Sequence, residues 1–235
     1  MTKPLSFFIC AVLVLAVSIN VQARPRDPLS VELPQLEAIP GAEWFWVAQR
    51  MARNNVPMTI KMFNYRGDVE EVQKYYVGLW KTKGHGKSRT KIIGDLIILS
   101  TDIDGYVYSA QFSQKGDYVK GKLVVSPTPL NAKYEKKSEL PIPPRSSIEN
   151  KIESLDGARR SETLNIESRL RVPQIVDFYN IEMDRQGWKQ YASSGNGRDS
   201  AVVSFQRGGE LLQLTVTGLQ GRNSKFSEVL IHWIK

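Results

Sequence analysis

The feature that most constrains this fold is a helical pattern that occurs twice, 103 residues apart. Residues 69–80 and residues 172–183 each carry apolar side chains at three- and four-residue spacing. Such a stripe is typical of an amphipathic helix that buries one face. The matching positions are Val69 and Val172, Val72 and Ile175, Tyr75 and Phe178, Tyr76 and Tyr179, Trp80 and Met183, and Gly84 and Gly187. This shared register favours an internal duplication.

Signals at the helix ends support both helices. Asp68 is a candidate N-cap, and Glu71 stands three residues later, at capping-box spacing. Gly187 is expected to adopt the left-handed conformation that ends a helix, with Trp188 covering the end of the core. Only one member of an adjacent aromatic pair can face the sheet, because neighbouring helix positions differ by about 100°. We therefore interpret the stretch FYNIEMDRQGW as packing.

Strand-like runs surround each helix. In the first half they are residues 58–63, 91–100, 106–112 and 118–126, and in the second half residues 161–169, 200–206, 210–219 and 226–234. Turn residues such as Asp-Gly and Gly-Gly separate several of these runs. The predicted fold class is α+β, with two tandem β-α-β-β-β lobes, each made of one helix packed on an antiparallel sheet.

These patterns divide the chain into five parts. The predicted parts are a signal peptide (1–23), an N-terminal arm and helix (24–57), a first α+β lobe (58–126), a linker (127–160) and a second α+β lobe (161–235). The helix before the first lobe is predicted from the spacing of Trp44, Val47, Ala48 and Met51. The linker is predicted from its five prolines and many charges.

The first 23 residues have the pattern of an export signal. Lys3 precedes an apolar stretch that starts at Phe7, and Val21-Gln22-Ala23 offers small residues at the positions that a signal peptidase reads. Cleavage after Ala23 would make the protein periplasmic or secreted, with no integral membrane span. The alternative is a retained anchor, although the apolar run is shorter than the roughly 20 residues that span a bilayer.

Cysteine and histidine usage argues against several kinds of chemistry. The only cysteine is Cys10, within the predicted signal, so the mature chain would have neither a disulfide nor a thiolate site. His85 and His232 are far apart in sequence, and no metal or cofactor site is predicted. Asp102 and Asp104 resemble the start of a calcium loop, but the later ligands are missing, so we interpret them as a hairpin turn. No catalytic residues are predicted, and the protein is expected not to be an enzyme.

The charge balance points to an acidic partner. The chain has 32 Lys and Arg against 24 Asp and Glu, a formal net charge of +8. For an exported protein, this favours an envelope protein or an acidic envelope polymer over nucleic acid. The candidate partner-binding residues are Lys81, Lys83, Lys87, Arg89, Lys91 and Trp233. The alternative is that the basic residues are simply solvated loop positions. The oligomeric state is left open.

Two stretches carry a resemblance to a known group of proteins. GAEWFWVAQRMARNNVPMTIKMF (41–63) and the FY…M…GW pattern (178–188) resemble segments of exported, functionally uncharacterised proteobacterial proteins. The resemblance implies a periplasmic protein with a duplicated helix-on-sheet lobe, and it implies no catalytic residues. The predicted order of elements is also similar to cystatin-like lobes, which often bind peptides or protein partners.

The sequence therefore predicts a non-enzymatic periplasmic binding or accessory protein of an envelope system, of the secretion or pilus-assembly type. A small-ligand or lipid carrier is the alternative. An envelope hydrolase would require a nucleophile beside His85 or His232. The contact region is expected in the cleft between the lobes, or at an exposed sheet edge such as residues 226–234.

Overall fold

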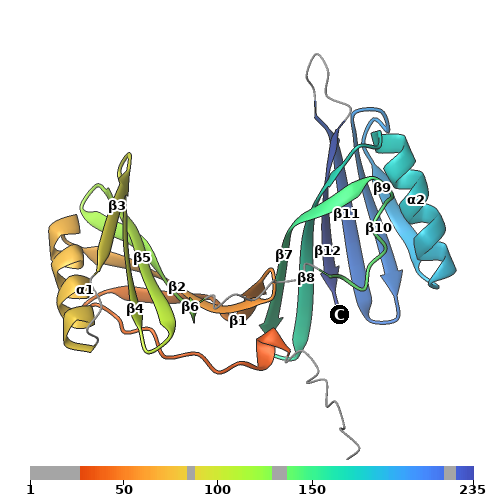
Figure 1. The fold of residues 1–235 in the computed structure, drawn as a ribbon. Coiled ribbons are helices and arrows are strands. Elements are labelled where there is room, and N and C mark those ends of the chain that lie inside the picture. Colours follow the sequence, from red (N-terminus) through yellow and green to blue (C-terminus); the bar gives the residue numbers. More distant parts are fainter. Residues whose placement is uncertain (1–26, 84–87, 129–136, 220–225) are drawn as a thin grey trace, which may run out of the picture.

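The computed structural model describes residues 27–83, 88–128, 137–219 and 226–235 (Figure 1). We call residues 27–128 the first half and residues 137–235 the second half. The first half contains η1 (Pro28–Ser30), β1 (Glu43–Arg53), β2 (Val56–Arg66), α1 (Val69–Lys83), β3 (Arg89–Ile93), β4 (Leu96–Ile103), β5 (Tyr106–Lys115) and β6 (Tyr118–Pro127). The second half contains β7 (Ser146–Asp156), β8 (Arg159–Ser168), α2 (Val172–Arg185), β9 (Lys189–Ser194), β10 (Ser200–Arg207), β11 (Glu210–Gly218) and β12 (Ser227–Ile234).

The predicted fold class is wrong. The twelve strands in the described residues form one antiparallel sheet, in the order β3-β4-β5-β6-β2-β1-β7-β8-β12-β11-β10-β9, so the protein is predominantly β and not two α+β lobes. The sheet continues from one half to the other because β1 pairs with β7. Four residue pairs make this join, from Arg50 opposite Leu155 to Arg53 opposite Ile152. Both strands lie in segments for which the sequence predicted no strand.

Residues 43–53 form strand β1 and not the predicted helix. The run EWFWVAQRMAR begins with aromatic and β-branched residues, which favour a pleated surface. The decisive feature is the Asn54-Asn55 turn, where φ is 50° and 63°. Two successive positive φ values are typical of a two-residue type I′ hairpin turn, and asparagine tolerates them. Strand β1 therefore folds back on β2 as a hairpin.

The predicted linker contains strand β7 and the start of β8. The last of its prolines is Pro144, and strand pairing begins at Ser146. The β7–β8 hairpin turns after Asp156, where Gly157 has a φ of 59°.

In the first half, the run 91–100 forms two strands and not one, because a turn at Gly94-Asp95 separates β3 from β4. Each half therefore has a four-stranded meander where three strands were predicted.

The two helices begin and end close to their predicted bounds. The Asp68 carboxylate accepts a hydrogen bond from the backbone N–H of Glu71 at 2.9 Å, which is N-cap geometry. After α2, Gly187 has a φ of 79° and Trp188 is buried in the core, as predicted. The predicted stop at Gly84 lies outside the described residues. Figure 1 shows α1 and α2 at opposite ends of the molecule, on its outer sides, whereas the short 3-10 helix η1 lies near the join of the halves.

Each helix packs on a core of its own. In the first half, Val72, Tyr76 and Trp80 of α1 meet Phe63 and Leu123 of the sheet. In the second half, the buried face of α2 meets β-strand side chains from β8, β10, β11 and β12. A segment before each set of strands completes its core. The buried residues of these segments are Leu36 and Ile39 in the first half and Leu140 in the second half.

The two halves differ at one pair of matching tyrosines. Tyr76 and Tyr179 are both fully buried, and burial raises the pKa of both phenols. The Tyr76 hydroxyl donates to the Glu37 carbonyl at 3.4 Å. The Tyr179 hydroxyl has no hydrogen-bond partner among the described residues. Apart from η1, the order of described elements is the same in both halves, and the duplication itself stays a hypothesis.

This difference predicts opposite effects for one conservative substitution. Tyr179→Phe should leave the free energy of unfolding unchanged or raise it by up to about 1 kcal/mol, because it removes an unsatisfied buried hydroxyl. Tyr76→Phe should lower it by about 0.5–1 kcal/mol, because a hydrogen bond is lost. Urea denaturation of both variants measures the two values. A clear loss of stability in Tyr179→Phe would contradict the prediction.

Candidate binding site

The structure places most of the predicted basic residues at one end of the first half. Lys81 is exposed in the last turn of α1, and Lys83 forms an exposed ion pair with Glu37. Arg89 and Lys91 are exposed on β3, which is an edge strand of the sheet. The predicted residue Lys87 lies outside the described residues. Trp233 is in the other half of the molecule.

Trp233 is a core residue. Its side chain is only 5% exposed, and its indole N–H donates to the Glu210 carboxylate at 3.0 Å. Its ring packs edge-on against Trp188, with 6.2 Å between the ring centroids. Its strand, β12, lies inside the sheet between β8 and β11. The prediction of an exposed edge at residues 226–234 is therefore wrong, and Trp233 offers little surface to a partner.

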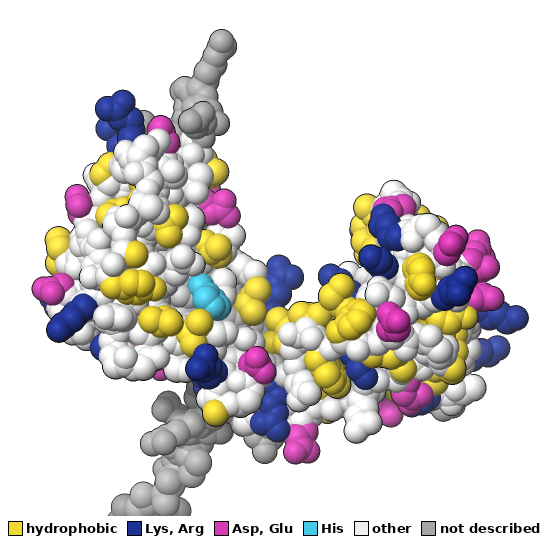
Figure 2. All heavy atoms as spheres, turned by 180° about the vertical axis from the view of Figure 1, so that it is seen from behind, with side chains coloured by type: hydrophobic (Ala, Val, Ile, Leu, Met, Phe, Trp, Pro, Cys, Tyr) yellow, Lys and Arg dark blue, Asp and Glu magenta, His cyan; other side chains and the backbone are white. Residues whose placement is uncertain are grey.

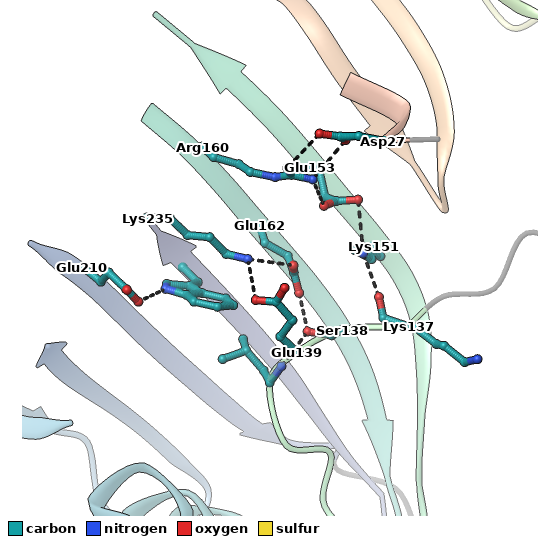
Figure 3. A network of polar contacts seen from close by, with 12 residues as sticks. Asp27, Lys137, Ser138, Glu139, Lys151, Glu153, Arg160, Glu162, Glu210 and Lys235 are labelled. Carbon is teal, nitrogen blue, oxygen red and sulfur yellow. Dashed lines mark hydrogen bonds and ion pairs between the residues drawn. The ribbon is translucent and has the colours of Figure 1, made fainter. Parts of the chain in front are cut away.

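Buried charges gather on β7 and β8 next to the join between the halves (Figure 3). The Lys151 ammonium lies 3.1 Å from the Glu153 carboxylate and donates to the Lys137 carbonyl at 2.7 Å. Glu153 also accepts from Arg160 at 2.9 Å. Lys151, Glu153 and Glu162 are buried. In most proteins, lysine and glutamate side chains are exposed.

These charges hold three segments that are distant in sequence. Arg160 donates to the Asp27 carboxylate at 3.0 Å and 3.2 Å, which fixes the start of the described N-terminal segment. Ser138 donates to Glu162, and the Lys235 ammonium lies 3.9 Å from the same carboxylate. We call Asp27, Ser138, Lys151, Glu153, Arg160, Glu162 and Lys235 the anchor network. Its groups are paired with one another, which is the arrangement of a structural support.

Strand β1 has a free edge beside this join. It pairs with β2 along its length, but it pairs with β7 only over residues 50–53. The register with β2 shifts between Trp46 and Ala48 and again between Ala48 and Met51. Such bulges bend a strand and increase its twist. Residues 43–48 therefore diverge from β7, and within the described residues their main chain pairs with β2 alone.

The divergence opens a groove of about 690 Å³ between the halves. We call it the junction groove. Its lining comes from β1 (Trp46, Val47, Ala48 and Gln49), from the β7–β8 hairpin (Ser154, Leu155, Asp156, Gly157, Arg159 and Ser161) and from β12 (His232 and Ile234). The His232 ring and the Thr163 hydroxyl lie 3.0 Å apart in a hydrogen bond. Figure 2 shows hydrophobic side chains along the hollow between the halves.

Large apolar side chains are exposed on one side of the groove. Phe45, Trp46, Val47 and Met62 are 46%, 48%, 54% and 45% exposed. Phe45 is directly opposite Met62 in the β1–β2 pair, so these two side chains share one face of the sheet, whereas Trp46, the next residue of the strand, projects from the other face. We call these four residues the apolar patch. A cluster of exposed large apolar residues is the usual mark of an interaction site, whereas single ones are ordinary.

Cations lie near this patch on both faces of the sheet. The Lys61 ammonium lies 5.0 Å from the Trp44 ring centroid and 4.7 Å from that of Trp46, in cation–π geometry. Within the described residues, Lys61 has no ion pair with a carboxylate. Lys122 is exposed on β6 and stands directly opposite Met62. Arg159 lines the groove itself.

The groove cannot be found from the sequence while residues 44–51 are predicted to be a helix. The apolar spacing of Trp44, Val47, Ala48 and Met51 matches a helical stripe, and that match hides the strand. The signal that could have found it is the Asn54-Asn55 pair between two runs of eleven residues each. The sequence predicts a contact region in the cleft between the halves without identifying its residues.

Two further observations bear on chemistry and location. No group of three or more His, Cys, Asp or Glu in the described part of the chain is placed to hold a metal ion. Within the same residues, neither helix has the length and apolar character needed to cross a membrane.

Comparisons with protein-family models, with curated proteins and with solved structures find no match to this chain.

Proposed function

We propose that this protein is a non-enzymatic binding or accessory component of the bacterial envelope, exported to the periplasm, and that it binds a protein partner in the junction groove. The apolar patch carries this proposal. Fully burying a Phe or Val side chain contributes about 1.5–3 kcal/mol, so several such residues are enough for a specific contact. Aromatic residues are also enriched at the centres of protein interfaces.

The shape of the surface favours a protein over a lipid bilayer. The patch lies beside a groove between the two halves, which rise on either side of it (Figure 1). A flat membrane would meet the outer ends of the halves before it reached Phe45 or Val47. A narrow polypeptide segment can enter the groove, and basic residues around it favour an acidic partner.

The carrier alternative has less support. The cavity described between α1 and the sheet, lined by Leu36, Tyr76 and Trp80 among others, has a volume of about 40 Å³. Sites for small ligands ordinarily measure roughly 300–1,000 Å³. An acyl chain does not fit between this helix and the sheet, so an open groove is the better candidate for binding.

Site-specific photo-crosslinking in the native host tests the proposed function. A photoreactive phenylalanine at Val47 should form an adduct with one protein, which mass spectrometry then identifies. The same residue at Ile181, which is exposed on the outer side of α2, is the matched control and should give no such adduct. Adding Phe45→Glu should abolish the adduct at Val47. Equal crosslinking at both positions would contradict the proposal.

Export has a separate test. The purified protein from the native host should begin at Arg24, the residue after the predicted cleavage site. N-terminal sequencing of the periplasmic fraction measures this directly. A protein that keeps its first 23 residues would instead support the retained anchor.

A further inference from the structure

We propose that the junction groove binds an extended, acidic polypeptide segment, which adds to the sheet as a strand beside residues 43–48 of β1. This inference rests on the proposed function and specifies how the partner binds. Strand addition combines main-chain hydrogen bonds, which provide affinity, with contacts to alternate side chains, which provide specificity.

The free edge of β1 supplies the main-chain part. An interior strand ordinarily pairs on both sides. Within the described part of the chain, however, residues 43–48 of β1 pair only with β2. Among the residues that the structure describes, no strand pairs on their other side, because β7 ends at Asp156 and the chain turns back into β8. Six residues of strand span roughly 20 Å at about 3.3 Å per residue, enough for a paired segment of five or six residues. The added strand would occupy the position that β7 holds beside residues 50–53.

The groove distinguishes this edge from the two outer edges of the sheet. Strands β3 and β9 are also edge strands, but every residue of both is exposed. Arg89 and Lys91 on β3 are the kind of charge that protects an edge, and the hollow beside β9 is lined by the charged residues Asp184, Arg185 and Lys189. Beside β1, an added strand would contact Trp46 and Val47 on one side and the β7–β8 hairpin on the other.

The charges around this edge select the partner. Lys61, Lys122 and Arg159 are near the patch or line the groove, whereas the nearby acids are Glu43 and Asp156. The cations exceed the acids, and among the described residues Lys61 contacts aromatic rings and no carboxylate. Alternate residues of the partner would face the two sides of the sheet, so its apolar side chains would lie on the side of Phe45 and Met62 and its carboxylates on the side of Lys61.

The test begins with a random library of twelve-residue peptides displayed on phage and selected on the purified full chain. Enriched peptides should alternate apolar and acidic residues. One enriched peptide is then synthesised as a series of variants, each N-methylated at a different position. Each variant lacks one main-chain hydrogen-bond donor. Strand addition predicts that affinity falls at least tenfold at every second position and less than threefold between them, because alternate N–H groups face β1.

Disulfide trapping locates the peptide. Cys10 is the only cysteine in the chain, so Val47→Cys in a Cys10→Ser background has a single thiol. Peptides that carry one cysteine should form a disulfide with this thiol at one or two adjacent positions. Ile181→Cys is the matched exposed control and should trap none above background.

The outcomes separate the two proposals. A flat N-methylation profile, with binding still lost in Phe45→Glu, would overturn strand addition and leave binding at the groove intact. If no peptide is selected, strand addition is overturned and groove binding loses support. The same holds if the Phe45→Glu and Trp46→Glu variants bind the peptides with unchanged affinity. Binding of anionic vesicles or an acidic polysaccharide in place of peptides would overturn the acidic polypeptide as the partner.

Discussion

Replacing Glu153 with alanine should lower the free energy of unfolding by about 3–5 kcal/mol, which is the usual cost of removing one member of a buried ion pair. Glu153 is buried, and its carboxylate pairs with Lys151 at 3.1 Å and with Arg160 at 2.9 Å. Without it, the Lys151 ammonium stays buried with the Lys137 carbonyl as its remaining described partner. The loss is large because a buried charge then loses its ion-pair partner.

Two comparisons make this prediction specific. The double variant Lys151→Met, Glu153→Leu removes both charges and should recover much of the loss. Asp95→Ala breaks an exposed ion pair with Lys115 and should cost less than about 1 kcal/mol. Guanidinium denaturation of the three variants measures all of these values. An equal small effect for Glu153→Ala and Asp95→Ala would show that the anchor network contributes little to stability.

Replacing Phe63 with alanine should also cost about 3–5 kcal/mol. Phe63 lies at the centre of the first core, where its ring centroid is 5.4 Å from that of Trp44 and 6.2 Å from that of Tyr76. It covers Gly121, the residue directly opposite on β6. Alanine would leave a cavity bounded by aromatic rings that α1 and the sheet hold in place. Thermal or urea unfolding measures the loss.

At Gly121, which the Phe63 ring covers, a larger side chain should destabilise the protein by overpacking the core. A Cβ added at Gly121 would lie 2.5 Å from Phe63 Cζ and 2.8 Å from Phe112 Cβ, so Gly121→Ala should destabilise by about 1–3 kcal/mol through overpacking. Adding Phe63→Leu should relieve part of that cost. Gly78→Ala on α1 is the matched control, because no atom lies within 4 Å of its added Cβ. It should raise stability by up to about 1 kcal/mol. A neutral Gly121→Ala would contradict the close packing described here.

The sequence could predict the helices because their signals are local. The Asp68 cap, the apolar stripes and the Gly187 stop each involve residues within a few positions of one another. Strand β1 was missed because Trp44, Val47, Ala48 and Met51 satisfy a helical spacing by coincidence. There, the hairpin turn and the partner strand decide the conformation. Tertiary pairing thus overrode the local pattern.

The candidate site could not be predicted for a related reason. Its free edge exists because β1 and β7 pair over only four positions, and no local pattern specifies where such a pairing stops. The anchor network joins Asp27 to Arg160, which are 133 residues apart. Lys151, Glu153 and Glu162 lie in or just after a segment interpreted as a solvated linker. Their burial depends on segments that meet them only in the folded chain.

The join between the halves also determines when the chain can complete its fold during synthesis. Residues 43–53 of β1 leave the ribosome long before Ile152–Leu155, and Asp27 emerges long before Arg160. Until then, β1 has an unpaired edge along its whole length and the N-terminal segment lacks its anchor. Contacts of such large sequence separation form slowly. A nascent chain that stops before β7 should therefore be cut by protease near residue 27, whereas the finished protein resists.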